Sequence, residues 1–122
     1  MNRKISISEN YGNNWGDIYD DETLIEPICQ ASVLRYSYKG SRKNNLFFLN
    51  PSDKNRRINM TLRLSDDLGS SWKDFVTLHE GPSAYSDLTK LPNGNLGCLF
   101  EAGIKNPYEG IVFKEVDINK FN

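Results

Sequence analysis

The sequence has few of the residues that build metal, cofactor and disulfide sites. It contains two cysteines, Cys29 and Cys98, and one histidine, His79. Two thiols cannot form a disulfide framework, and neither has the spacing of a metal-binding motif. Because both cysteines lie in apolar alternating runs, we expect buried free thiols rather than a bridge, and neither a metal nor a cofactor. His79 has no Cys or Asp partner pattern around it, which favours a surface role.

Long apolar runs and an excess of one charge are also absent. No run approaches the roughly 20 residues of a membrane span, and 15 basic residues nearly balance 16 acidic ones. The composition therefore gives no reason to expect nucleic-acid or anionic-membrane partners. The first residues lack the apolar segment of a signal peptide. The compartment stays open, because the chain is expected to be cytoplasmic if complete and secreted or at the cell surface if a fragment.

An internal repeat is the clearest positive feature of the sequence. Residues 8–15 match residues 65–72 in the form Ser-x-(Asp/Asn)-x-Gly-x-x-Trp, and we call these segments the first and second box. The polar side chains can hydrogen-bond across a turn, glycine supplies a left-handed conformation, and tryptophan anchors the turn on a sheet. The boxes therefore predict a fold device rather than a catalytic one, and a repeat of this length suggests propeller blades.

Alternating apolar and polar residues predict an all-β protein. No segment has a convincing helical period, and only the tail, residues 117–122, is compatible with a single turn. Asn93-Gly94 is a strong hairpin signal between two of the expected strands. The expected strands cover residues 4–8, 30–38, 45–49, 59–65, 75–79, 85–91, 96–101 and 110–116.

The order of the strands predicts a cluster of polar side chains. We name the strands of one unit inner, second, third and outer. In an antiparallel meander, the starts of the inner and third strands lie at the same end as the end of the second strand. The boxes join third to outer strands and therefore lie at the opposite end. The residues expected to cluster are Gln30, Tyr85, Glu101, Arg56 and Arg57.

This set of side chains suits an anionic ligand. Arginine presents a planar fork that pairs bidentately with a carboxylate, and a neighbouring glutamate can fix that fork. A tyrosine hydroxyl, with a reference pKa of about 10, is neutral at working pH. A neutral nucleophile suits a reacting carbon that already bears a carboxylate, because the negative charge would repel an Asp or Glu nucleophile.

Several segments resemble the exo-α-sialidase (neuraminidase) family of bacteria and animals. The two boxes resemble its Asp-box (BNR) repeats. Sialidases are glycoside hydrolases that use a tyrosine as nucleophile, and sialic acid carries the carboxylate described above. The segments that carry the resemblance are 84–88, 97–101 and 108–113 for the last blade, 48–51 and 57–61 for the blade before it, and 28–32 for a further strand.

The resemblance implies a fold and roles for individual residues. The chain would be a single partial domain, residues 1–122, of a six-bladed β-propeller. It would hold the end of one blade, one full blade and most of the last, roughly two blades of antiparallel four-stranded meanders. Tyr85 would be the nucleophile, Arg57 the third arginine that binds the substrate carboxylate, Glu101 the residue that orients the first arginine, and Gln30 a sugar contact. Arg56 competes for the role of Arg57, and register with the following residues favours Arg57.

The same resemblance predicts an incomplete site. The first two arginines of the family, its aspartate acid/base and the glutamate that activates the tyrosine match no residue here. Without a base and an acid, the isolated chain should have little or no activity in releasing terminal sialic acid from glycoconjugates with retention. The last blade would also lack its outer strand, and the open edge predicts dimerisation or strand exchange. The alternative is a non-catalytic Asp-box module that binds sialylated glycans or has a structural role.

Overall fold

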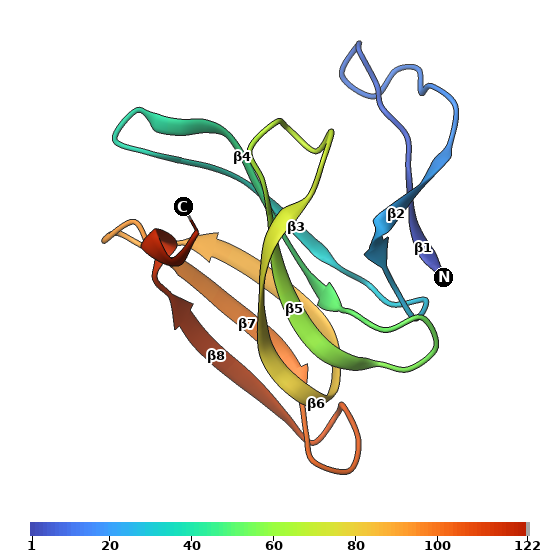
Figure 1. The fold of residues 1–122 in the computed structure, drawn as a ribbon, viewed down its shortest axis with the longest axis vertical. Helices are drawn as coiled ribbons and strands as arrows, with labels where there is room; N and C mark the ends of the chain where they lie inside the picture. Colours follow the sequence, from blue (N-terminus) through green and yellow to red (C-terminus); the bar gives the residue numbers. More distant parts are fainter. Residues whose placement is uncertain (122) are drawn as a thin grey trace.

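The protein is built almost entirely of β-strands, as the alternation predicts (Figure 1). The computed structural model describes residues 1–121, without the side chains of residues 74 and 75. A short 3₁₀ turn lies in the tail where a single turn was expected. The elements are β1 (Asn2–Ile5), β2 (Tyr19–Ile25), β3 (Ser32–Tyr38), β4 (Ser41–Pro51), β5 (Ile58–Ser65), β6 (Lys73–Lys90), β7 (Leu96–Ala102), β8 (Gly110–Val116) and η1 (Ile118–Lys120).

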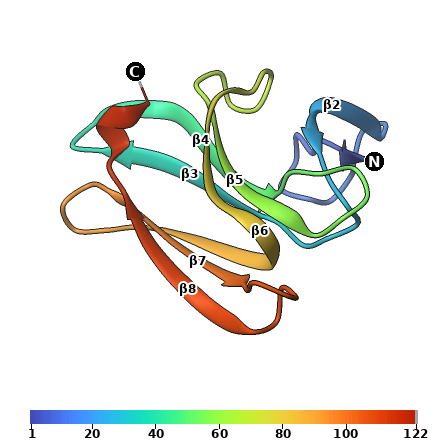
Figure 2. The same ribbon diagram turned by 60° about the horizontal axis from the view of Figure 1, so that its bottom comes forward.

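All strand pairs are antiparallel neighbours in the chain. β1 and β2 form a two-stranded sheet, and β3 to β8 follow one another in a six-stranded sheet. The expected meander is therefore confirmed. Figure 2 shows that the six-stranded sheet curls at β6, so that β3 and β4 lie above β7 and β8. Within the described residues no helix has the length and apolar character needed to cross a bilayer.

The strand β6 differs from the prediction of two separate strands, 75–79 and 85–91. It runs for 18 residues and pairs with β5 through its first part and with β7 through its second. Gly81-Pro82 lies between these two predicted strands. The backbone passes through because Ser83 N–H donates to the Arg57 carbonyl on one side and the Pro82 carbonyl accepts from Gly103 N–H on the other, at 2.9 and 3.0 Å. This strand therefore joins the meander β3–β6 to the meander β6–β8.

The strand β2 was not predicted at all. Its sequence, Tyr-Asp-Asp-Glu-Thr-Leu-Ile, is mostly exposed and carries little apolar alternation. It forms because β1 pairs with it, with a register shift between Asn2 and Arg3. β1 itself ends at Ile5 rather than extending to residue 8.

Both boxes form turns between a third and an outer strand, as predicted. Asp67 in the second box and Asn10 in the first each accept a hydrogen bond from the backbone N–H four residues on, at 2.9 and 2.8 Å. The box glycines adopt positive φ values of 87° and 90°, a conformation in which glycine has no steric penalty. The boxes are therefore structural turns.

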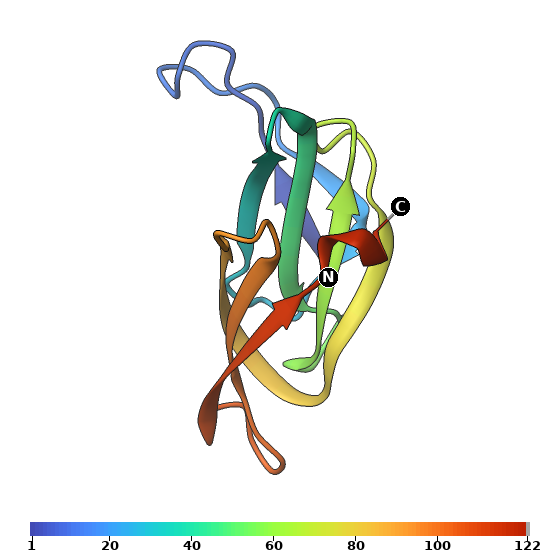
Figure 3. The same cartoon turned by 90° about the vertical axis from the view of Figure 1, so that its left-hand side faces the viewer.

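The two box tryptophans have different surroundings. Trp72 is half-buried and packs on Phe48 of β4 with ring centroids 5.6 Å apart. Trp15 is 65% exposed. Among the described residues no strand pairs with the free edge of β1, so the first box has no counterpart of Phe48. Figure 3 shows the loop of the first box (blue) projecting away from the sheet.

The hydrophobic core lies inside the curl of the six-stranded sheet. It unites one face of β4 and β5 with the facing side of β7, and Phe121 of the tail packs edge-on against Phe47 at 5.4 Å. Cys98 lies in this core as a free thiol, and burial raises its pKa to about 12. Cys29 is also buried and free, with a pKa raised mainly by burial. Both cysteines therefore behave as predicted.

Candidate active site

One end of the six-stranded sheet carries the candidate site. In Figure 1 both box loops lie at the top, whereas the loop before β5 and the loop after β7 lie at the bottom. A pocket of about 440 Å³ at this lower end is lined by Gln30, Tyr85 and Glu101. Its lining also includes Phe100 of β7 and Ile111 of β8. Strand order alone had placed the three predicted residues together.

Tyr85 lies at an irregularity in the β6–β7 ladder. The register shifts between Ser83 and Ser86, and the Glu101 carboxylate accepts the Tyr85 backbone N–H at 3.1 Å. The side chain is 50% exposed. Among the described side chains none forms a hydrogen bond with the Tyr85 hydroxyl. The phenol is therefore partly accessible, and its oxygen has no hydrogen-bond partner among the described residues.

Arg57, and not Arg56, contacts Tyr85. The guanidinium carbon of Arg57 lies 5.7 Å from the centroid of the Tyr85 ring, within the range of a cation–π interaction. Its Nη2 donates to the Ile28 carbonyl at 3.1 Å and its Nη1 to the Tyr108 hydroxyl at 2.7 Å. Arg56 is exposed and lines a different pocket.

The charge of Arg57 is favoured by its surroundings. Burial alone lowers the pKa of the guanidinium, but Cys29, Tyr108 and Tyr85 act in the other direction and raise it overall. No carboxylate lies within ion-pair distance of Arg57 among the described residues. The site therefore holds a fixed cation without an acidic partner.

Gln30 connects the two meanders. Its Oε1 accepts from Ser86 N–H at 2.9 Å and its Nε2 donates to the Ser86 carbonyl at 3.0 Å. The amide thus mimics a strand partner for β6, next to Tyr85. Its side chain lines the pocket while both polar atoms are engaged.

Two contacts of Arg57 were not predicted. Tyr108 was part of a recognised motif but had no role, and its hydroxyl comes from the β7–β8 loop. Ile28 has a φ of 57°, a left-handed conformation that is rare for a β-branched residue, and it presents its carbonyl to Arg57. Neither contact has a periodic sequence signal, because each depends on the conformation of a loop.

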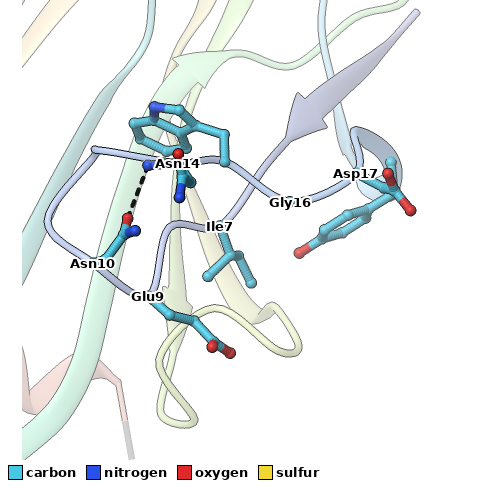
Figure 4. Close-up of a pocket in the computed structure, with 8 residues that line it drawn as sticks. Ile7, Glu9, Asn10, Asn14, Gly16 and Asp17 are labelled. Carbon is cyan, nitrogen blue, oxygen red and sulfur yellow. Dashed lines mark hydrogen bonds between the residues drawn. The ribbon is translucent and has the colours of Figure 1, made fainter.

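A larger pocket lies elsewhere, at the first box (Figure 4). It has a volume of about 680 Å³ and is lined by Ile7, Glu9 and Asn10, among others. The Asn10 oxygen is already bonded to Asn14 N–H, the dashed line in Figure 4. All residues that line this pocket lie between residues 7 and 19, and the Asn10 side chain serves the turn. We therefore place the candidate site at Tyr85.

The chain is similar to known proteins in sequence and in fold. No family model matches the chain. The sialidase of Micromonospora viridifaciens is 34% identical over 105 residues, which is 83% of this chain and 16% of that protein. Sialidase-3 of Bos taurus is 39% identical over 93 residues, or 74% of this chain and 20% of that protein. The sialidase of Bacteroides fragilis is 26% identical over 121 residues, covering 93% and 22% respectively.

Solved structures give the same answer for the fold. The Hadza microbial sialidase Hz136 superposes with a TM-score of 0.76 at 25% identity and covers 93% of this chain and 22% of that chain. The NanB sialidase from Streptococcus pneumoniae has a TM-score of 0.76 at 22% identity, with 94% and 20% covered.

The fold and these matches define an all-β chain that forms part of a β-propeller. More particularly, the chain is similar in sequence and fold to sialidases, which are glycoside hydrolases, and corresponds to a partial sialidase domain. The resemblance to exo-α-sialidases is thus confirmed. The chain spans 16% to 22% of the length of these curated relatives.

Proposed function

We propose that this chain supplies the nucleophile and one carboxylate-binding arginine of a sialidase active site. The whole enzyme would release terminal sialic acid from glycoconjugates with retention of configuration. The observation that carries the proposal is the cation–π contact of Arg57 with Tyr85 at 5.7 Å, where Tyr85 lines a pocket of a chain similar to sialidases.

Arg57 is proposed to bind the carboxylate of the substrate. Two of its nitrogens are held by Ile28 and Tyr108, which fixes the plane of the guanidinium. Its other N–H groups have no partner among the described residues and are available to an oxyanion. The absence of an acidic partner favours an anionic ligand, since the ligand would complete the ion pair.

Tyr85 is proposed to attack the anomeric carbon. Its oxygen forms a bond to that carbon, the bond to the leaving-group oxygen breaks, and the phenol proton passes to a base. Water then displaces the tyrosine, so that two inversions give net retention. The base and the acid are proposed to come from residues outside this chain, because no described side chain is bonded to the Tyr85 hydroxyl.

Glu101 and Gln30 are proposed to support these groups. Glu101 uses Oε2 to hold the Tyr85 backbone, and its Oε1 would orient a further arginine of the complete site. Gln30 holds Ser86 beside the nucleophile and is exposed in the pocket wall, where it would contact the sugar.

The alternative is a module that binds sialylated glycans without chemistry. The lack of a base at the Tyr85 hydroxyl among the described residues favours this alternative. Arg57 would keep its role under it, whereas Tyr85 would serve only as an aromatic surface.

A chimera tests the proposal. The matching segment of the Micromonospora viridifaciens sialidase is replaced by this chain, and hydrolysis of a fluorogenic sialoside is measured. Tyr85→Phe should lower the turnover by roughly 10³-fold or more, as removal of a nucleophile does. The matched control is Tyr38→Phe, whose hydroxyl bonds the Pro92 carbonyl far from the pocket, and this variant should keep the turnover of the chimera.

Three outcomes distinguish the catalytic proposal from the non-catalytic alternative. Unchanged turnover in Tyr85→Phe would show that Tyr85 is not the nucleophile. A folded chimera that binds a sialic acid analogue without hydrolysing the sialoside supports the non-catalytic alternative. A folded chimera that does neither contradicts both.

A further inference from the structure

We propose that Tyr108 is a positioning residue for Arg57, and that the loop of residues 103–109 exists in this form to hold it there. The proposal rests on the proposed function, since it assigns Arg57 to the substrate carboxylate. Beyond that function, it assigns a role to Tyr108 and to its loop and gives a chemical reason for each.

The contact crosses from one meander to the other. Arg57 comes from the loop before β5 and Tyr108 from the loop after β7, 51 residues further along the chain. The hydroxyl accepts from Nη1 at 2.7 Å while the Ile28 carbonyl accepts from Nη2 at 3.1 Å. Because the two acceptors hold different terminal nitrogens, they restrict rotation of the guanidinium plane. The guanidinium carbon lies 5.7 Å from the centroid of the Tyr85 ring.

Tyr108 reaches this position because Glu109 closes the loop. The Glu109 carboxylate accepts three backbone N–H groups, from Ile104, Lys105 and Asn106, at 3.1, 2.7 and 2.8 Å. These bonds lower the pKa of Glu109. The Tyr108 N–H donates to the Asn106 side chain at 2.9 Å. The loop is thus organised by its own charged residue, while Tyr108 itself is 61% exposed.

The base of the loop is fixed to β6. The Gly103 N–H donates to the Pro82 carbonyl at 3.0 Å, and the Gly103 carbonyl lies 3.1 Å from His79 Nε2. A Cβ at Gly103 would lie 2.0 Å from the Asn106 carbonyl oxygen, so the loop packs too closely on its base for any side chain there. A tight, anchored loop places the tyrosine with little freedom.

The chemistry of the acceptor explains why a phenol suits this position. A neutral hydroxyl orients the arginine but leaves its charge uncompensated. A carboxylate in the same place would form an ion pair with Arg57 and compete with the substrate. The adjacent acidic residue, Glu109, is turned into its own loop, where three N–H groups occupy it.

NMR spectroscopy of the 122-residue chain tests the proposal. The guanidinium signals of Arg57 are recorded, and N-acetylneuraminic acid is titrated into the wild type and Tyr108→Phe. Separate, slowly exchanging Nη–H signals are expected in the wild type and averaged signals in Tyr108→Phe. The dissociation constant should rise roughly tenfold, as expected for a lost hydrogen bond to a charged group.

Three variants control the measurement. Tyr11→Phe changes a fully exposed tyrosine and should leave both readouts at wild-type values. Arg57→Met should abolish specific binding. Glu109→Gln leaves both partners of the contact intact but weakens the loop, and should shift both readouts in the direction of Tyr108→Phe.

Unchanged Arg57 signals in folded Tyr108→Phe would overturn the proposal. If Tyr108→Phe unfolds, Glu109→Gln is used instead, and unchanged Arg57 signals in that variant would overturn the proposal. If the wild-type chain binds no N-acetylneuraminic acid, the carboxylate role of Arg57 fails in this chain. The guanidinium signals still decide whether Tyr108 positions the arginine.

Discussion

At the scale of single residues, the candidate site depends on a break in regular pairing. Tyr85 lies where the β6–β7 register shifts, and Glu101 supplies the acceptor for its N–H at 3.1 Å. A β-bulge changes the direction of a side chain and is common beside active sites. The Tyr85 ring lies beside Arg57, which is held by two further acceptors.

Gly103 offers a direct test of the loop that carries Tyr108. We expect Gly103→Ala to lower the free energy of unfolding by about 1–3 kcal/mol, because its Cβ would lie 2.0 Å from a backbone oxygen. Gly110→Ala is the matched control, since its nearest atom would be at 3.7 Å. Urea denaturation of the chain measures both. Equal stability of the two variants would show that the loop is not tightly packed.

The residues of the site differ in how far the sequence predicts them. The placement of Tyr85, Glu101 and Arg57 follows from strand order, because the topology of a meander fixes which strand ends lie together. Tyr108 and Ile28 could not be found in this way. One depends on a loop closed by an internal carboxylate, and the other on a left-handed backbone conformation, and neither has a periodic signal.

At the scale of elements, the two boxes form a natural pair of variants. The second box has Asp67 where the first has Asn10. Hydrogen bonds from Ser71 and Ser65 lower the pKa of Asp67 from 3.8 to about 2. Asn10 makes the same turn bond with an amide that does not titrate.

This difference predicts a pH dependence. Since the folded pKa of Asp67 is below the unfolded value, its contribution to stability is complete above pH 3.8 and is lost as the pH falls from 3.8 towards 2. Asp67→Asn should therefore reduce the decline of the melting temperature in that window. Asn10→Asp should add a similar decline. The hypothesis fails if the wild type and Asp67→Asn lose stability in parallel.

The box tryptophans should contribute unequally to stability. Trp72 packs on Phe48, whereas Trp15 is 65% exposed. We expect Trp72→Ala to destabilise the chain by about 2–4 kcal/mol and Trp15→Ala by less than about 0.5 kcal/mol. Chemical denaturation followed by circular dichroism compares them. A large effect of Trp15→Ala would mean that its box is covered in solution.

The strands show where sequence periodicity is informative. β5 and β7 are predicted almost to the residue, because each has one buried and one less buried face. β2 is missed since it is acidic and mostly exposed, and its pairing with β1 decides its structure. β6 is longer than predicted because its neighbours bond the backbone around Pro82 on both sides.

At the scale of the whole molecule, the six-stranded sheet has an open edge at β8, where no further described strand pairs with it. β8 is an edge strand, with Ile111 73% and Phe113 56% exposed. Open edges favour pairing with other strands, and dimerisation or strand exchange through this edge stays a prediction. The chain covers 16% of the Micromonospora viridifaciens sialidase and 20% of the Bos taurus one.

The chain alone should therefore show little or no sialidase activity. No described side chain is hydrogen-bonded to the Tyr85 hydroxyl, and an unactivated phenol is a weak nucleophile. A fluorogenic sialoside incubated with the purified 122-residue chain measures this. Robust hydrolysis, unaffected by further purification and lost in Arg57→Met, would show that the site is more complete than we infer.

The central claim is that Tyr85 forms the covalent bond to the sugar. A sialosyl fluoride with a second fluorine on the ring carbon next to the anomeric centre forms the adduct with loss of the anomeric fluoride. The second fluorine slows breakdown of the intermediate, so the adduct accumulates in the active chimera. Peptide mass mapping then locates it. We predict a sialosyl adduct on the peptide that contains Tyr85, absent in Tyr85→Phe. An adduct on another residue of an active, retaining chimera would contradict the account.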